Sequence, residues 1–208
     1  MKHSLLLLSI LFSFLSVFSQ EISTERSNFK GGLRAGFTAS QISGDDLSGF
    51  NKLGAYAGGF VNFPLSQNAK WKLQVELNFI MKGSSLFTRG VNSPNIGRKY
   101  TLNLFYTETP VMVKYNFFKG FELELGPSIN FLFASKEVNE QGDLHRKPFR
   151  FYEFSVVVGL SYLFVEHWGI NFRFSNSIIP VRIPNWVINQ WVNKQYNTVL
   201  ALSAYYQF

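Results

Sequence analysis

Paired carboxylates are the first feature of this sequence that could carry out chemistry. Glu122 and Glu124 are two positions apart, so on an extended strand both side chains point the same way, about 7 Å apart. Inverting glycosidases separate their acid and base by a comparable distance. The pair is therefore a candidate acid–base site for a sugar substrate, provided that a substrate can reach it.

A serine activated by a histidine is the second combination. His145 lies in a long connecting segment, and Ser135 is the nearest serine upstream at the same end. Both residue types are too common for this pairing to be a signature, and the other two histidines are His3 and His167. The chain has no cysteine, which excludes disulfides, thiolate metal sites and cysteine nucleophiles. Without a metal-spaced cluster or a glycine-rich phosphate loop, we expect no metal and no cofactor.

The elements that position these residues are strands. In segment 71–82, apolar residues occupy every odd position from Trp71 to Met81, while Lys72, Gln74 and Glu76 lie between them. Alternation with a period of two is typical of a strand with one apolar face. The same pattern predicts eight strands over residues 29–41, 53–63, 71–82, 100–117, 121–134, 150–164, 168–176 and 196–208. In the fourth strand the apolar positions change from even to odd, which predicts a β-bulge near Tyr106–Glu108, beside Pro110.

Loop lengths and aromatic residues place these strands in a membrane. The connections alternate between short ones (64–70, 118–120, 165–167) and long ones (42–52, 83–99, 135–149, 177–195), as in outer-membrane barrels. Every strand also has an aromatic residue on its apolar face at the short-turn end, which is typical of a membrane interface: Phe29, Phe63, Trp71, Phe117, Phe121, Phe164, Trp168 and Phe208. The sequence thus predicts an all-β fold, an eight-stranded antiparallel up-and-down transmembrane β-barrel. A soluble, lipocalin-like barrel is the alternative.

Residues 1–19 have the pattern of a secretory signal peptide, with a basic start, an apolar run and small residues before Gln20. We therefore expect a barrel domain over residues 20–208 in the bacterial outer membrane, with both mature termini in the periplasm. The formal net charge is +7, and charged residues make up only 16% of the chain. For an exported protein, lipid phosphates are a better match for this charge than nucleic acid.

The inward face of the predicted barrel carries five basic and five acidic residues: Arg34, Lys72, Lys82, Lys114, Arg173, Glu76, Glu108, Glu122, Glu124 and Glu153. An eight-stranded barrel has room only for its own side chains, and buried charges must be paired. We expect a charge network that plugs the lumen and keeps substrates away from Glu122 and Glu124. A narrow ion path, the alternative, would show an excess of one sign.

Basic and aromatic residues in two outer loops suit lipopolysaccharide phosphates, the headgroup boundary or a protein partner: Arg89, Arg98, Lys99, Arg182, Trp186, Trp191 and Lys194. They could also be ordinary anchoring and solubility residues. The last strand is apolar at alternate positions up to Tyr206 and Phe208. Such a terminal strand resembles the signal that the barrel-assembly machinery reads, which makes that machinery an expected partner during biogenesis.

Several segments resemble the PorT-like family of small Gram-negative outer-membrane β-barrels: "LRAGFTASQISGDD" (33–46), "LQVELNFIMKG" (73–83), "FYTETPVMVKY" (105–115), "LELGPSINFLFASK" (123–136) and "LALSAYYQF" (200–208). The chain departs from the family at Val75, where proline is frequent, and in the unusually aromatic loop 177–195. The residues favour a non-enzymatic structural or surface-interaction protein. The resemblance implies the alternative of a component or assembly factor of a secretion or transport machine, and a lipid-modifying enzyme is a third hypothesis.

Overall fold

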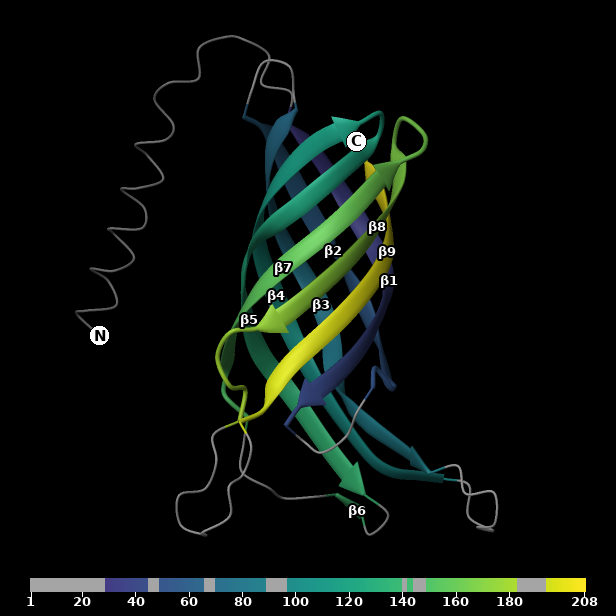
Figure 1. Ribbon diagram of the computed structural model, residues 1–208, viewed down its shortest axis with the longest axis vertical. Coiled ribbons are helices and arrows are strands. Elements are labelled where there is room, and N and C mark those ends of the chain that lie inside the picture. The colour runs from purple at the N-terminus through teal and green to yellow at the C-terminus, as the bar shows by residue number, and fades with distance from the viewer. Residues whose placement is uncertain are drawn as a thin grey trace, which may run out of the picture.

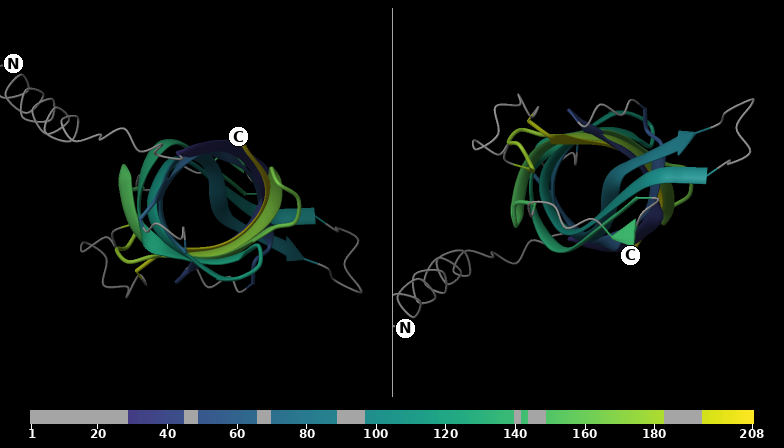
Figure 2. Two further views of the ribbon diagram at one scale, coloured as in Figure 1. Left: turned by 90° about the horizontal axis from the view of Figure 1, so that it is seen from above. Right: turned by 90° about the horizontal axis from the view of Figure 1, so that it is seen from below.

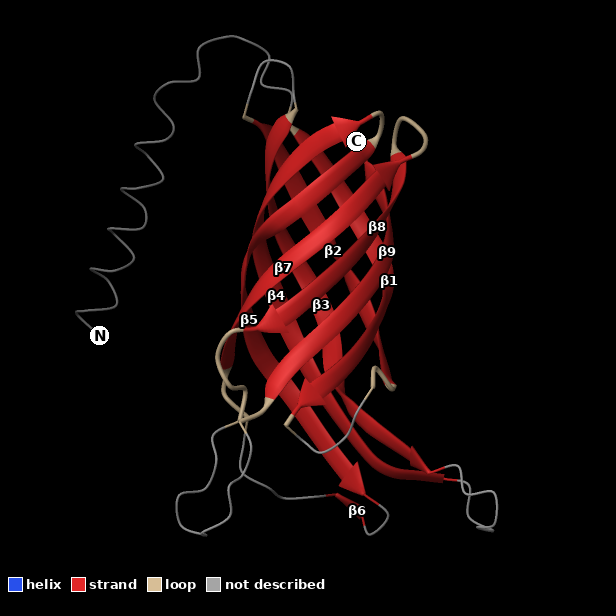
Figure 3. Cartoon of the chain, viewed as in Figure 1, coloured by secondary structure: helices blue, strands red, loops and turns tan. Residues whose placement is uncertain are grey.

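The computed structural model describes residues 29–44, 49–65, 70–88, 97–139, 142–143, 149–182 and 194–208. This part of the chain contains no helix that could span a membrane. Its regular structure is β-strand (Figures 1 and 3), as β1 (Lys30–Ser43), β2 (Lys52–Pro64), β3 (Trp71–Thr88), β4 (Gly97–Phe118), β5 (Phe121–Asn139), β6 (Gly142–Asp143), β7 (Tyr152–Leu163), β8 (Trp168–Ser177) and β9 (Tyr196–Gln207).

Eight of these strands form a closed antiparallel barrel. Neighbours in the sheet are neighbours in the chain, β4 pairs with β5, and β9 pairs with β1 to close the ring (Figure 2). The two-residue β6 is an appendage that pairs only with the end of β5. The predicted eight-stranded up-and-down barrel is therefore confirmed. Closure pairs the strand edges with one another, so that backbone polar groups are satisfied within the sheet.

Burial follows the alternation read from the sequence. Along β8 every second residue is exposed, beginning with Trp168, and the residues between them, Arg173 among them, are buried. In β8 the apolar side chains face outward and the polar ones inward, the reverse of a soluble barrel. This arrangement suits a barrel whose outer surface contacts lipid.

The short turns lie at one end of the barrel, where β1 begins and β9 ends. There the Phe208 N–H donates to the Gly31 carbonyl at 2.9 Å. All eight predicted girdle aromatics lie on the outer surface of this end and are at least partly exposed. Neighbouring rings touch, as with Phe29 and Phe63, whose centroids are 5.0 Å apart.

Three strands extend much further at the opposite, long-loop end. β3, β4 and β5 have 18, 22 and 19 residues, against 10 in β8. The predicted loop 83–99 is wrong at both ends, because 83–88 belong to β3 and 97–99 to β4. Likewise, 135–139 of the predicted loop 135–149 belong to β5. Apolar alternation did not mark these segments because small polar residues such as Ser84 and Ser85 are buried there.

The predicted bulge in the fourth strand is also wrong. From Leu102 to Lys114, β4 keeps a single alternation in which the even-numbered residues are buried. The irregularity nearest Tyr106 lies in β5, where Phe105 pairs with Ala134 but Tyr106 pairs with Leu132, which leaves Phe133 as the extra residue. The pattern misled because the loop-side half of the lumen is apolar, so Leu102 and Leu104 mark the inner face and not the outer one.

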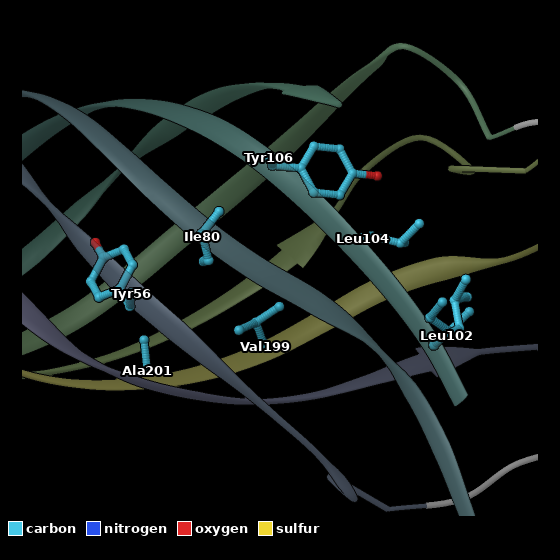
Figure 4. Close-up of a cluster of buried hydrophobic side chains, with 8 residues drawn as sticks. Tyr56, Ile80, Leu102, Leu104, Tyr106, Val199 and Ala201 are labelled. Carbon is cyan, nitrogen blue, oxygen red and sulfur yellow. The ribbon is translucent and has the colours of Figure 1, made fainter. Parts of the chain in front are cut away.

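This apolar half of the lumen is one packed cluster, part of which Figure 4 shows. Its buried members come from five strands: Ile42, Tyr56, Ile80, Leu102, Leu104, Tyr106, Val199 and Ala201. The lumen therefore has two zones, an apolar one toward the long loops and a charged one toward the short turns.

Candidate functional site

Arg173 of β8 is the centre of the charged zone. Its guanidinium donates to both oxygens of Glu76, at 2.8 and 2.7 Å, and to Glu124 at 2.9 and 2.7 Å. It also donates to the Tyr56 hydroxyl at 3.1 Å. Fork-shaped guanidinium groups suit such multiple contacts with carboxylates. The Arg173 side chain of β8 thereby makes hydrogen bonds across the lumen to residues of β2, β3 and β5.

Arg34 of β1 adds a second guanidinium on the same acid. Its Nη2 lies 3.3 Å from Glu76, and its Nη1 donates to Asn171 at 3.3 Å. The guanidinium carbon also lies 5.1 Å from the centre of the Phe60 ring, within the range of a cation–π contact.

Lysines hold the two carboxylates that were candidates for acid–base chemistry. Lys114 lies 2.7 Å from Glu122 and 2.9 Å from Glu124, and Lys72 also contacts Glu122. Glu124 is further engaged by Arg173. Each carboxylate is thus bound by two cations, in a site where the Lys114 and Glu124 side chains are almost fully buried. The geometry favours a structural role for the pair over catalysis.

A second ion-pair cluster lies next to the apolar zone. Lys82 contacts Glu153 at 2.8 Å and Glu108 at 3.9 Å. Asn130 and Asn197 also donate to Glu153. A cavity of about 10 Å³ is large enough for about one water molecule. It is lined by residues of both charge clusters, Glu108 and Arg173, and by Tyr56 among others.

All ten interior charges point into the lumen and have an oppositely charged partner within 4.0 Å. Lys72 is the most open of them, with 22% of its side chain exposed. The sequence reasoning missed the neutral members of the network, of which Tyr56, Gln74, Asn78, Asn130 and Asn197 make hydrogen bonds to the charges. They occupy the alternate strand positions that point inward, and this was the signal that could have identified them.

At the loop end, Arg182 joins a smaller cluster. Its Nη2 lies 2.7 Å from Glu137, which also accepts a hydrogen bond from the Tyr100 hydroxyl at 2.6 Å. The guanidinium carbon lies 4.1 Å from the centre of the Phe149 ring, within the range of a cation–π contact. Arg182 is therefore engaged within the chain, whereas Lys194 is exposed.

The remaining predicted residues are not brought into one site. For Arg98 and Lys99 the structure gives only a place in β4, and Arg89, Trp186, Trp191 and His145 lie outside the described residues. Ser135 is exposed on β5, and Tyr206 packs against Trp168 on the outer surface. Within the described ranges, no group of three or more acidic, histidine or cysteine residues is placed to hold a metal ion.

Comparison with known proteins agrees with this geometry. The family model described as "Outer membrane protein beta-barrel domain" matches residues 18–182. Ail, the attachment invasion locus protein of Yersinia pestis, is similar in structure with a TM-score of 0.51 at 12% identity, over 86% of this chain and 98% of Ail. Neisserial surface protein A gives 0.49 at 11% identity, over 88% of this chain and 98% of its own. OprG of Pseudomonas aeruginosa gives 0.44 at 13% identity, over 88% and 97%. No curated protein matches the sequence.

Proposed function

Because the chain belongs to the outer membrane protein beta-barrel domain family, we propose that it is a bacterial outer-membrane protein with a plugged lumen and a structural or surface-interaction role. In this proposal the barrel is an anchor without enzymatic activity. The long-loop end contacts lipopolysaccharide or a protein partner outside the cell.

The observation that carries the proposal is the cross-lumen contact of Arg173 with Glu76 and Glu124. Charges that bind each other across the lumen fill the space that a permeating solute would need. Moving them apart would leave buried charges without partners, at a cost of several kcal/mol each. Transport through the barrel is therefore disfavoured, and the surfaces at its two ends are left as the functional regions.

The proposed orientation places the short turns and both mature termini in the periplasm, and the long loops outside. Short periplasmic turns and long outer loops are the usual arrangement in such barrels. The ring of aromatics at the short-turn end marks one membrane interface in this arrangement. The extended ends of β3, β4 and β5 then lie on the outer side.

A second candidate function is a component or assembly factor of a secretion or transport machine in the outer membrane. Two features favour it: the PorT-like sequence segments, and the length of β3, β4 and β5, which offers a protein partner more surface than loops alone. Both functions need a partner at the loop end.

Site-specific photo-crosslinking in intact cells tests the proposal. A photoreactive amino acid replaces Arg89 or Trp186 in the outer loops, and Lys119 in a short turn is the matched control position. We expect adducts with lipopolysaccharide or with a discrete protein from the two loop positions only. Adducts from Lys119 alone would contradict a role for the outer surface. A change in the mass of lipid A on expression would instead indicate a lipid-modifying enzyme.

A further inference from the structure

The ladder between β2 and β3 ends before either strand does. Its last pair toward the loops is Tyr56 with Ile80, yet β2 begins at Lys52 and β3 continues to Thr88. Over this stretch β2 stays paired with β1 as far as Lys52, and β3 stays paired with β4. The β2–β3 ladder is therefore interrupted between two strands that remain paired on their other sides, and we call this interruption the seam.

Beyond the seam, β3 passes over the inner face of β2 and contacts β1. The hydroxyl of Thr38 on β1 donates to the Met81 carbonyl at 2.7 Å, and the Ser40 hydroxyl donates to the Gly83 carbonyl at 3.1 Å. Both hydroxyl side chains belong to the inward face of β1 and are buried. In the view from the loop end, the β3–β4 hairpin crosses the opening of the barrel (Figure 2).

Gly54 of β2 makes this crossing possible. A Cβ atom at Gly54, which would point into the lumen, would lie 2.3 Å from the Met81 carbonyl oxygen and 3.0 Å from the Met81 Cβ. The outer face of β3 thus rests directly on the inner face of β2 at a position without a side chain. In an ordinary ladder these two faces would point in opposite directions.

The crossing closes the mouth of the barrel. Leu102 and Leu104 of β4 enter the lumen with the hairpin and belong to one cluster with Ile42 of β1 and Val199 of β9. All four are at most 1% exposed. Glu153 and Lys82, which belong to the second charge cluster, lie next to these residues on the side of the short turns.

We propose that residues 81–88 of β3 and the β4 residues paired with them form a hinged lid with two positions, a closed seat and an open seat. In the closed seat, seen here, the Thr38 and Ser40 hydroxyls hold it over the lumen. In the open seat β3 extends its ladder along β2 beyond Tyr56 in unchanged register, with Met81 opposite Ala55 and Gly83 opposite Leu53. In the closed seat the Leu53 carbonyl instead accepts a hydrogen bond from the Lys52 ammonium at 2.9 Å.

Opening the lid exchanges several interactions. It gains backbone hydrogen bonds along β2. It loses the two hydroxyl bonds, the burial of Leu102 and Leu104, and the contacts of Lys82, which belongs to the lid, with Glu153 at 2.8 Å and Glu108 at 3.9 Å. It admits solvent or a small ligand from outside to the apolar zone, down to Glu153, and leaves the Arg173 layer intact. The inference goes beyond the proposed surface role, because the lid controls access to the lumen whatever partner the outer surface binds.

Disulfide trapping tests the open seat, since the chain has no cysteine of its own. In the double variant Ala55→Cys with Met81→Cys, the two thiols are directly opposite only in the open seat. The matched control is Val61→Cys with Val75→Cys, an outward-facing pair in the intact part of the same ladder. We expect the control to cross-link fast and the test pair to cross-link slowly but to completion in isolated outer membranes. A test pair that stays reduced under exhaustive oxidation, while the control cross-links, would overturn the proposal.

The hydroxyl contacts supply a second test. Thr38→Val with Ser40→Ala removes both bonds, and we expect it to raise the cross-linking rate of the test pair about five- to thirtyfold. Thr109→Val is the control, because it removes a hydroxyl-to-carbonyl bond of the same 2.7 Å length between β4 and β5. An equal effect of both changes, or none, would contradict the lid.

Access to the lumen is measured separately by labelling Val199→Cys with a membrane-impermeant maleimide. The Thr38 and Ser40 changes should speed labelling by the same factor as cross-linking, and Thr109→Val should not. Labelling that is no faster than in the Thr109→Val background would show that the mouth does not open. The mobility difference between unheated and heated samples confirms in each case that the barrel is folded.

Discussion

Arg173 and Glu124 meet over a glycine. They lie on β8 and β5 with β7 between them, and Gly159 of β7 is in register with both. A Cβ atom on Gly159 would lie 2.9 Å from the Arg173 Cγ and 3.0 Å from a Glu124 oxygen. The missing side chain lets the two charged groups bridge directly across a strand, at 2.7 Å.

Filling this position should weaken the barrel. We expect Gly159→Val to lower the free energy of unfolding by about 1–3 kcal/mol, as for overpacked cores. Gly59→Val on β2 is the control, because the nearest atoms to a Cβ there are at 3.6 Å, an ordinary contact. Urea unfolding in lipid vesicles measures both. Equal stabilities would mean that Arg173 and Glu124 can adjust around the added side chain.

Removing the central cation should cost more. Arg173→Met leaves Glu76 and Glu124 without their shared guanidinium, and breaking a buried ion pair from one side costs about 3–5 kcal/mol. Adding Glu124→Gln should restore part of the loss. The control Lys72→Met removes a partly exposed partner of Glu122 and should cost about 1 kcal/mol or less. A small loss for Arg173→Met would argue against a packed charge network.

The purified protein should show negligible single-channel conductance in planar bilayers. The reason is that five cations and five carboxylates bind one another inside the barrel. Stable open channels of nanosiemens size would be incompatible with a plugged lumen. An unrelated open porin reconstituted in the same way is the positive control.

Trypsin added to intact cells should cut after Arg89 or Arg146, in the long connections, but not after Lys147, which precedes Pro148. It should also spare Lys119 in a short turn. Arg98, which belongs to the β4 ladder, should be cut more slowly. Lysed cells serve as the control in which Lys119 becomes accessible. Cleavage at Lys119 in sealed cells would invert the proposed orientation.

Phe208→Ala should lower outer-membrane levels several-fold while refolding into detergent stays nearly normal. Phe208 is 67% exposed, so its loss should cost no more than about 1 kcal/mol, whereas the assembly machinery would lose part of its signal. Phe164→Ala, which removes another girdle aromatic from a different strand, is the control. Equal losses in both assays would make Phe208 an anchor only.

The outer surface and the charged zone could be predicted from the sequence because both depend only on which alternate positions of a strand point outward and which point inward. Lipid on one side and packed charges on the other force opposite chemistries on alternate residues, as along β8. This rule failed in β4 because the inner face at Leu102 and Leu104 is as apolar as the outer one. An alternation read from hydrophobicity cannot tell two apolar environments apart.

The crossing of β3 over β2 could not be predicted for a different reason. It depends on a contact between β1 and β3, which no pairing of neighbouring strands implies. Gly54 gave no signal, since a glycine in a strand is equally consistent with a bulge or a bend. The specific pairing within the charge network was also out of reach, because alternation places residues on a face without saying which of them meet.

The pairing of β9 with β1 has a consequence for the time course of folding. The ladder that includes Gly32 with Gln207 joins the two ends of the described chain, so the entropy of closing the largest possible loop opposes it. Until it forms, the two strand edges stay open to pairing with other chains. Aggregation therefore competes with insertion during the interval before closure. Protection by chaperones during that interval matters more to the yield of folded protein than the stability of the finished barrel does.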